Sequence, residues 1–154
     1  MIEVLEQYPA STTYNYCLCD HIIDRITITS EAVTFSFPNG FSLLNDKEMI
    51  ISGSGSVRVI GCSPQEGINC WIIRRRATKQ GAKLYGKPVS LSKLSELLEK
   101  KKLKIEIFCE MYEQHRLYWK GVLLPSNNLR LSTLVIFESV NDYKIEYSWD
   151  LEAN

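Results

Sequence analysis

The feature that most constrains the fold is a change in the spacing of apolar residues near position 103. Leucines recur at helical spacing before that point, at positions 91, 94, 97 and 98, and Ser90 or Ser92 can cap the helix that they predict. From Leu103 to Trp149, apolar and polar residues alternate instead, and polar turns divide this stretch into four strands. We therefore predict an α+β fold, mainly antiparallel β, with one amphipathic helix at about 91–102 and a four-stranded C-terminal antiparallel meander.

The alternation also predicts which residues of the meander lie opposite one another. A slip of one residue would turn the apolar set outward, so we pair Tyr112 with Tyr118 and Val135 with Ile145. The odd-numbered residues then form one continuous apolar face, which the leucines of the helix can cover. The even-numbered face carries aromatic and aliphatic side chains among charged ones, with Tyr112 and Tyr118 together.

The N-terminal half is also predicted to be rich in strands. Apolar residues alternate with polar ones at 26–29 and 33–37, and further short strands are expected at 49–52, 57–62 and 68–76. Apolar residues occupy both faces of the last of these, which predicts a central strand covered on both sides. The chain of 154 residues has the length of one domain, and we expect a single domain over 1–154.

The composition is that of an ordinary globular protein, with 45% hydrophobic and 23% charged residues. The N-terminus lacks the basic residues and long apolar run of a secretory signal, and no apolar run approaches the roughly 20 residues that cross a bilayer. We therefore expect a cytoplasmic protein with no membrane partner. In that compartment the five cysteines are expected to be reduced.

The charge is unevenly distributed along a chain whose net charge is zero. Twelve of the 18 basic residues, but three of the 18 acidic ones, lie between positions 57 and 104. The densest basic stretch carries these candidate contacts to phosphate or to an acidic partner: Arg74, Arg75, Arg76, Lys79, Lys83, Tyr85 and Lys87. Basic groups with an aromatic residue can bind single-stranded nucleic acid. We favour the alternative of a solvated loop whose arginines pair with the acidic flanks of the sequence.

Cys17, Cys19 and His21 form the densest cluster of soft metal ligands. In an extended segment, neighbours on one face are about 6.6 Å apart along the backbone, whereas zinc holds each sulfur at about 2.3 Å. Convergence would require a bend and a further ligand. The candidates for that ligand are Cys62, Cys70, Cys109 and His115. We therefore predict no metal site and no cofactor, and no feature of the segment indicates a redox pair.

No local motif predicts catalysis, so we assign no catalytic residue, and an enzyme with a scattered catalytic set stays an alternative. We predict a non-enzymatic protein–protein interaction module, such as a small bacterial neutraliser or adaptor, that binds another protein or a second copy of itself. An aromatic centre within a polar rim is typical of an interface. The predicted contact residues are Phe108, Tyr112, Tyr118 and Leu134. We also expect the N-terminal strands to cover part of this even-numbered face.

Overall fold

The fold is α+β and mainly antiparallel, as predicted, with three sheets and one helix. The computed structural model describes residues 2–5, 16–45, 48–61, 67–113, 115–125, 132–139 and 142–150. The five-stranded sheet has the order β1 (Ile2–Leu5), β14 (Lys144–Trp149), β8 (Gly55–Ile60), β5 (Ala32–Phe37) and β4 (Arg25–Ile28). The six-stranded sheet has the order β10 (Gly81–Val89), β9 (Asn69–Thr78), β13 (Thr133–Ser139), β12 (Arg116–Leu124), β11 (Lys104–Glu113) and β3 (Ile22–Ile23). The small sheet has the order β2 (Tyr16–Cys17), β6 (Ser42–Asn45) and β7 (Glu48–Ile51).

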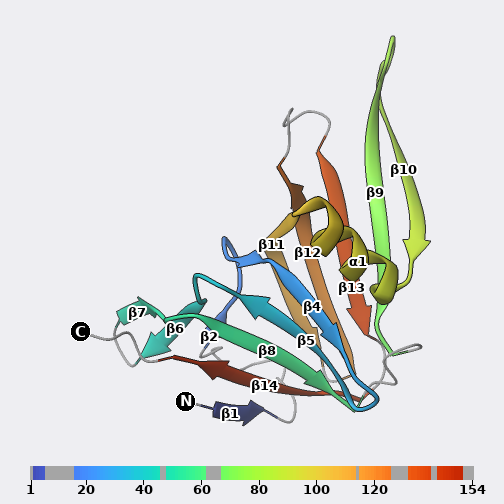
Figure 1. Cartoon of the computed structure of the whole chain (residues 1–154). Coiled ribbons are helices and arrows are strands. Elements are labelled where there is room, and N and C mark those ends of the chain that lie inside the picture. The colour runs from blue at the N-terminus through green and yellow to red at the C-terminus, as the bar shows by residue number, and fades with distance from the viewer. Residues whose placement is uncertain are drawn as a thin grey trace.

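The two larger sheets pack face to face around one contiguous apolar core (Figure 1). Phe35 of β5 crosses between the sheets, and its ring contacts Trp119 and Phe137 edge-on at centroid distances of 4.9 and 5.2 Å. The small sheet joins the same core, because Tyr16 of β2 stacks on Tyr147 of β14 at 4.0 Å. Aromatic pairs of this geometry add to the free energy gained from the burial of their surface.

The helix α1 (Leu91–Lys101) confirms the prediction from the leucine spacing. Ser90 is its N-cap, and the Ser90 side chain accepts a hydrogen bond of 3.2 Å from the backbone N–H of Lys93. Leu91, Leu94 and Leu98 are buried in the core. The helix lies beside β4, the edge strand of the five-stranded sheet, so that together they cover one face of the six-stranded sheet (Figure 1).

The C-terminal meander has three strands rather than the predicted four. β11, β12 and β13 pair in sequence order, but β14 joins the five-stranded sheet, where Ile145 pairs with Val59 and not with Val135. The edge of β13 is taken by β9, which sets Val135 opposite Ile72. Both arrangements bury the same alternating residues, so the local pattern does not distinguish them.

The predicted register between β11 and β12 is wrong because β11 contains a bulge between Ile107 and Cys109. Before the bulge Ile107 pairs with Gly121, and after it Cys109 pairs with Lys120, so Phe108 has no partner. An inserted residue reverses the side-chain alternation beyond it. The odd-numbered face is therefore not apolar throughout, and Tyr112 pairs with Leu117 instead of Tyr118.

Candidate functional site

The face of the six-stranded sheet that is turned away from the five-stranded sheet and α1, here called the outer face, exposes large apolar side chains. Trp71, Phe108 and Met111 are 40%, 44% and 47% exposed, and Leu84 on the edge strand β10 is 60% exposed. Partly buried apolar residues connect them across the strands: Ile73, Tyr118, Val122, Leu134 and Ile136. An exposed apolar face of this extent is typical of an interaction site.

The N-terminal strands do not cover this face, contrary to expectation. Phe35 of β5 packs against Trp119 and Phe137, which lie on the opposite, inner face of the six-stranded sheet. The inner face has the more continuous apolar pattern before the bulge, so it offers the larger apolar area for burial against the five-stranded sheet.

Three of the four predicted contact residues lie on the outer face, and one does not. Phe108, Tyr118 and Leu134 are there, whereas Tyr112 is 4% exposed because the bulge turns it into the core. The sequence analysis missed Trp71, which lies opposite Ile136 on the same face. β9 is apolar on both faces, so no local signal shows that Trp71 stays exposed while Cys70 and Ile72 are buried.

Charged side chains of both signs border the outer face. Arg116 forms an ion pair of 2.6 Å with Glu138, and the Lys120 ammonium lies 5.5 Å from the centroid of the Phe108 ring. Partial burial, with smaller contributions from Cys109 and Glu138, raises the pKa of Tyr118. An apolar centre with such a rim has the anatomy of a protein interface.

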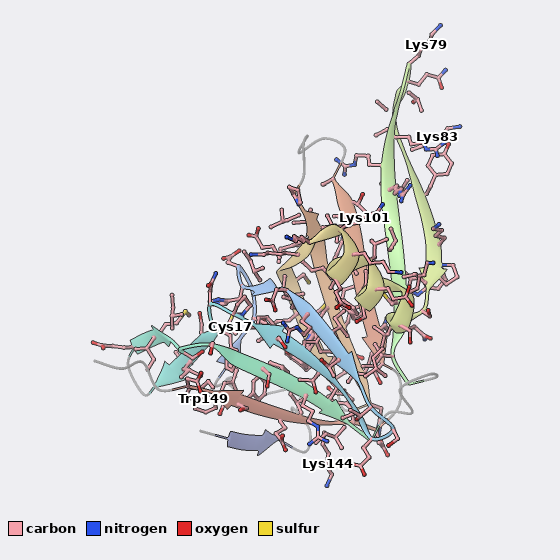
Figure 2. All side chains as sticks on the ribbon, in the orientation of Figure 1. Cys17, Lys79, Lys83, Lys101, Lys144 and Trp149 are labelled. Atoms are coloured by element: carbon pink, nitrogen blue, oxygen red, sulfur yellow. The ribbon has the colours of Figure 1, made fainter. Side chains whose placement is uncertain are left out.

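The strands β9 and β10 form a hairpin, here called the arm (residues 69–89), that projects beyond the rest of the sheet (Figure 1). The arm contains six basic residues and no acidic one. Lys79 lies at its tip and Lys83 farther down (Figure 2). The expectation of a solvated loop here is wrong, since the segment is paired continuously from Gly81 with Thr78 to Val89 with Cys70.

The pairing sorts the side chains of the arm onto two faces. Tyr85 lies opposite Arg74, and Lys83 lies opposite Arg76, so these four share the inner face with Lys87. The guanidinium of Arg76 lies 5.1 Å from the centroid of the Tyr85 ring. The outer face of the arm carries Arg75 and Leu84, opposite one another, and continues the apolar outer face of the sheet.

The arginines of the arm do not pair with the acidic flanks, as the sequence analysis had favoured. Within the described residues, the ion pairs are those of Arg58 with Glu31 and Glu146, Lys100 with Glu96, His115 with Asp142, and Arg116 with Glu138. The positive charge of the arm is therefore left for a ligand or solvent.

The segment from Cys17 to His21 bends instead of continuing as a strand. β2 ends at Cys17, Leu18 is completely buried, and Asp20 has a left-handed φ of 67°. The backbone N–H of His21 donates to the carbonyl oxygen of Leu18 at 3.1 Å, which closes a tight turn. The turn is anchored on β11 by a hydrogen bond of 2.7 Å from the N–H of Asp20 to the carbonyl oxygen of Ile107.

Glu110 reaches this turn from β11. Its Oε2 accepts hydrogen bonds from the backbone N–H groups of Leu18 at 2.5 Å and Cys19 at 3.0 Å. Its Oε1 accepts one of 3.0 Å from the Tyr112 hydroxyl, which in turn accepts one of 3.0 Å from the indole Nε1 of Trp119. Burial raises the pKa of Glu110, although these hydrogen bonds oppose the shift.

The argument that separated Cys17 from Cys19 is therefore wrong, because the turn folds them together. One ligand atom from each of Cys17, Cys19 and Glu110 lies within 4.8 Å of the other two. Burial and the Glu110 carboxylate raise the pKa of both thiols, that of Cys19 to about 12. The structure does not add Cys70, Cys109 or His115 to this group, and Cys62 lies outside the described residues.

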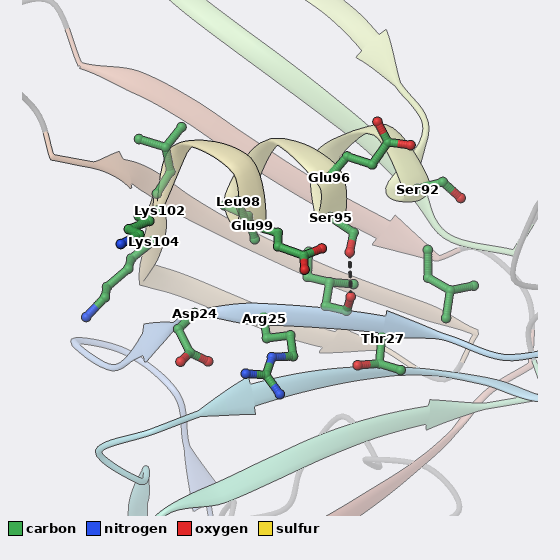
Figure 3. A pocket seen from close by; sticks show the side chains of 13 residues that line it. Asp24, Arg25, Thr27, Ser92, Ser95, Glu96, Leu98, Glu99, Lys102 and Lys104 are labelled. Carbon is green, nitrogen blue, oxygen red and sulfur yellow. Dashed lines mark hydrogen bonds between the residues drawn. The ribbon is translucent and has the colours of Figure 1, made fainter.

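The widest groove of the described residues runs between β4 and α1 (Figure 3). Its walls carry charges of both signs, including Asp24 and Arg25 on the strand side and Glu99 on the helix. The Ser95 hydroxyl on the helix donates to the carbonyl oxygen of Ile26 at 2.6 Å, so it serves to attach the helix to the edge strand. This groove offers no concentration of one charge and no activated hydroxyl.

No protein-family model, curated protein or solved structure matches this chain. Among the described residues, no helix is long and apolar enough to cross a membrane.

Proposed function

We propose that this chain is a binding module that docks an acidic partner protein on the outer face of its six-stranded sheet. The observation that carries this proposal is the exposure of Trp71, Leu84, Phe108 and Met111 on one face, beside an arm with six basic residues and no acidic one. Apolar contact would supply affinity, and the arm would select and orient a negatively charged partner.

The exposed side chains are sufficient for a specific complex. Full burial of a large apolar side chain contributes about 1.5–3 kcal/mol, so completing the burial of these four half-exposed ones contributes roughly 4 kcal/mol. That free energy corresponds to about a thousandfold in affinity. The partly buried neighbours and the charges of the arm would add to it.

The charge of the arm favours a different, acidic protein over a second copy of this chain. β10 is an edge strand, and it carries Lys83, Lys87 and Pro88. Lysine and proline on an edge oppose pairing with another strand, and two such arms side by side would repel each other. An acidic surface would instead neutralise them.

The test uses two double variants that remove similar apolar groups from different places. Trp71→Ser with Phe108→Ser alters the outer face, and Met49→Ser with Ile50→Ser alters the β6–β7 hairpin, where these side chains are 65% and 48% exposed. A protein captured from the native cell by the wild-type chain would be purified, and its binding would be measured by calorimetry at two salt concentrations.

We expect an acidic partner with 1:1 stoichiometry and an affinity that falls with salt. The outer-face variant should weaken binding at least tenfold, and the hairpin variant should leave it within twofold. Equal effects of both variants, a basic partner, or the absence of any stoichiometric partner would overturn the proposal. A dimeric mass in solution that only the outer-face variant abolishes would assign this face to self-association instead.

Single-stranded nucleic acid is a second candidate ligand, supported by the four cations and Tyr85 that share the inner face of the arm. Anisotropy of a labelled single-stranded oligonucleotide tests it, with Arg74→Gln and Arg76→Gln combined against Arg75→Gln on the opposite face. Binding should weaken steeply with salt, and the combined variant should reduce the slope by about 2. If Arg75→Gln alone reduces affinity as much, or if nothing binds at low salt, this candidate is excluded.

A further inference from the structure

We infer that Cys17, Cys19 and Glu110 form a binding site for a single thiophilic divalent metal ion, of which Zn²⁺ is the best fit. Cys17 lies at the end of β2 and Cys19 in the turn that follows, while Glu110 belongs to β11 of the six-stranded sheet. The site therefore joins two segments that are far apart in the sequence. It is independent of the outer face and the arm.

The ligand atoms are close to the separations that a tetrahedral ion requires. Zinc holds thiolate sulfur at about 2.3 Å and carboxylate oxygen at about 2.0–2.2 Å, so two sulfurs on one tetrahedral ion are about 3.8 Å apart. The two sulfurs and a Glu110 oxygen lie within 4.8 Å of one another without an ion. Side-chain rotation of an ångström or less for each pair would complete the geometry.

The backbone holds the ligands in this arrangement. The bulge at Phe108 turns Glu110 toward the turn, and bulges often re-aim a side chain at a functional site. The hydrogen bond from Asp20 to Ile107 fixes the turn against β11 next to that bulge. The Tyr112 hydroxyl orients the Glu110 carboxylate, as outer partners commonly do for metal ligands.

The donor set favours zinc over hard cations. Two sulfurs with one carboxylate suit a borderline ion, whereas Mg²⁺ and Ca²⁺ prefer an all-oxygen shell. Three protein ligands leave the fourth tetrahedral position for water. Cys17, Cys19 and Glu110 are all partly exposed, so solvent can reach that position.

The same atoms can be satisfied without a metal, and that alternative is specific. A carboxylate has about four lone-pair sites. The N–H groups of Leu18 and Cys19 and the hydroxyl of Tyr112 occupy three of them, and the thiol of Cys19 also hydrogen-bonds to the carboxylate. On this alternative Glu110 serves to hold the turn. Metal binding would replace the thiol hydrogens by the ion and release both thiol protons to solvent, with no change in oxidation state.

Titration of the reduced, metal-free full chain with Co²⁺ tests the inference directly. Thiolate ligation produces a sulfur-to-cobalt charge-transfer band in the near ultraviolet, and its intensity is proportional to the number of thiolates. We expect saturation at one equivalent with the intensity of two thiolates, and loss of the band when Zn²⁺ displaces Co²⁺. Alkylation followed by mass spectrometry should show that Zn²⁺ protects Cys17 and Cys19 but not Cys109.

Variants then identify the ligands, with circular dichroism confirming that each is folded. Cys17→Ser and Cys19→Ser should each remove half of the band, and Glu110→Gln should keep it but weaken Co²⁺ at least tenfold. Cys109→Ser, which alters a partly buried cysteine on the outer side of the bulge, should change neither intensity nor affinity. A wild-type chain with free thiols and no band at equimolar Co²⁺, or a band that persists when both Cys17 and Cys19 are serine, would overturn the inference and leave Glu110 as a turn anchor.

Discussion

The hydrogen-bonded chain from Glu110 through Tyr112 to Trp119 allows a quantitative test of the core by a single substitution, Tyr112→Phe. The Tyr112 side chain is 4% exposed and Trp119 is fully buried, so water cannot replace the missing hydroxyl easily. The variant loses a hydrogen bond to a carboxylate, worth about 1.5–3 kcal/mol, and leaves the buried Trp119 N–H without this acceptor, at a cost of about 1–3 kcal/mol. Because the two effects share one hydroxyl, we expect a total loss of about 3 kcal/mol rather than their full sum.

Urea denaturation followed by far-ultraviolet circular dichroism and tryptophan fluorescence measures this loss. With a typical urea dependence of about 2 kcal/mol per molar, the midpoint should fall by roughly 1.5 M. Tyr118→Phe is the matched control, since it removes the same atom from a partly exposed residue of the outer face and should change stability by less than about 0.5 kcal/mol. A loss below about 1 kcal/mol for Tyr112→Phe, or one no larger than the control, would refute the proposed role of the chain.

Three further predictions concern backbone packing, capping and titration. Gly121→Ala should reduce the free energy of unfolding by about 1–3 kcal/mol in urea, because its Cβ would lie 2.6 Å from Ile105 Cγ2 and 2.8 Å from the Glu106 oxygen; an unchanged midpoint would contradict this. Ser90→Ala should lower the unfolding free energy by about 1 kcal/mol through loss of the N-cap, whereas Ser90→Asp should restore it, as measured by thermal unfolding. The raised pKa of Glu110 means that the folded state holds this proton more tightly, so its contribution to stability is full below the unfolded value of 4.5 and declines as pH rises through the folded value. Urea titrations should therefore show wild-type stability decreasing relative to Glu110→Gln between pH 4.5 and 7, and a parallel pH dependence would contradict the shift.

The sequence predicted the elements whose patterns are local. The leucine spacing and Ser90 gave the helix to within one residue at its C-terminal end, because the capping residue and the buried face both lie within eleven residues. The alternating strands from 104 onward were also located, since a two-residue period is visible without knowledge of their partners.

The pairing of the strands could not be predicted in the same way. β14 and β9 both present alternating or continuous apolar residues that satisfy either larger sheet, and the choice depends on contacts between distant parts of the chain. The exposure of Trp71 belongs to the same class of problem. Its strand is apolar on both faces, and only the location of the five-stranded sheet decides which face is covered.

The bulge in β11 explains why the interaction surface and the cysteine turn were both misjudged from the sequence. A strict two-residue period assigned Glu110 and Tyr112 to the same face as Phe108. The bulge reverses the alternation, leaving Phe108 exposed beside Lys120 while Glu110 and Tyr112 turn inward. The same extra residue therefore supplies an aromatic group to the outer face and a carboxylate to the turn that carries Cys17. A feature of one residue in one strand thus sets the chemistry on both sides of the sheet, which no periodic pattern can show.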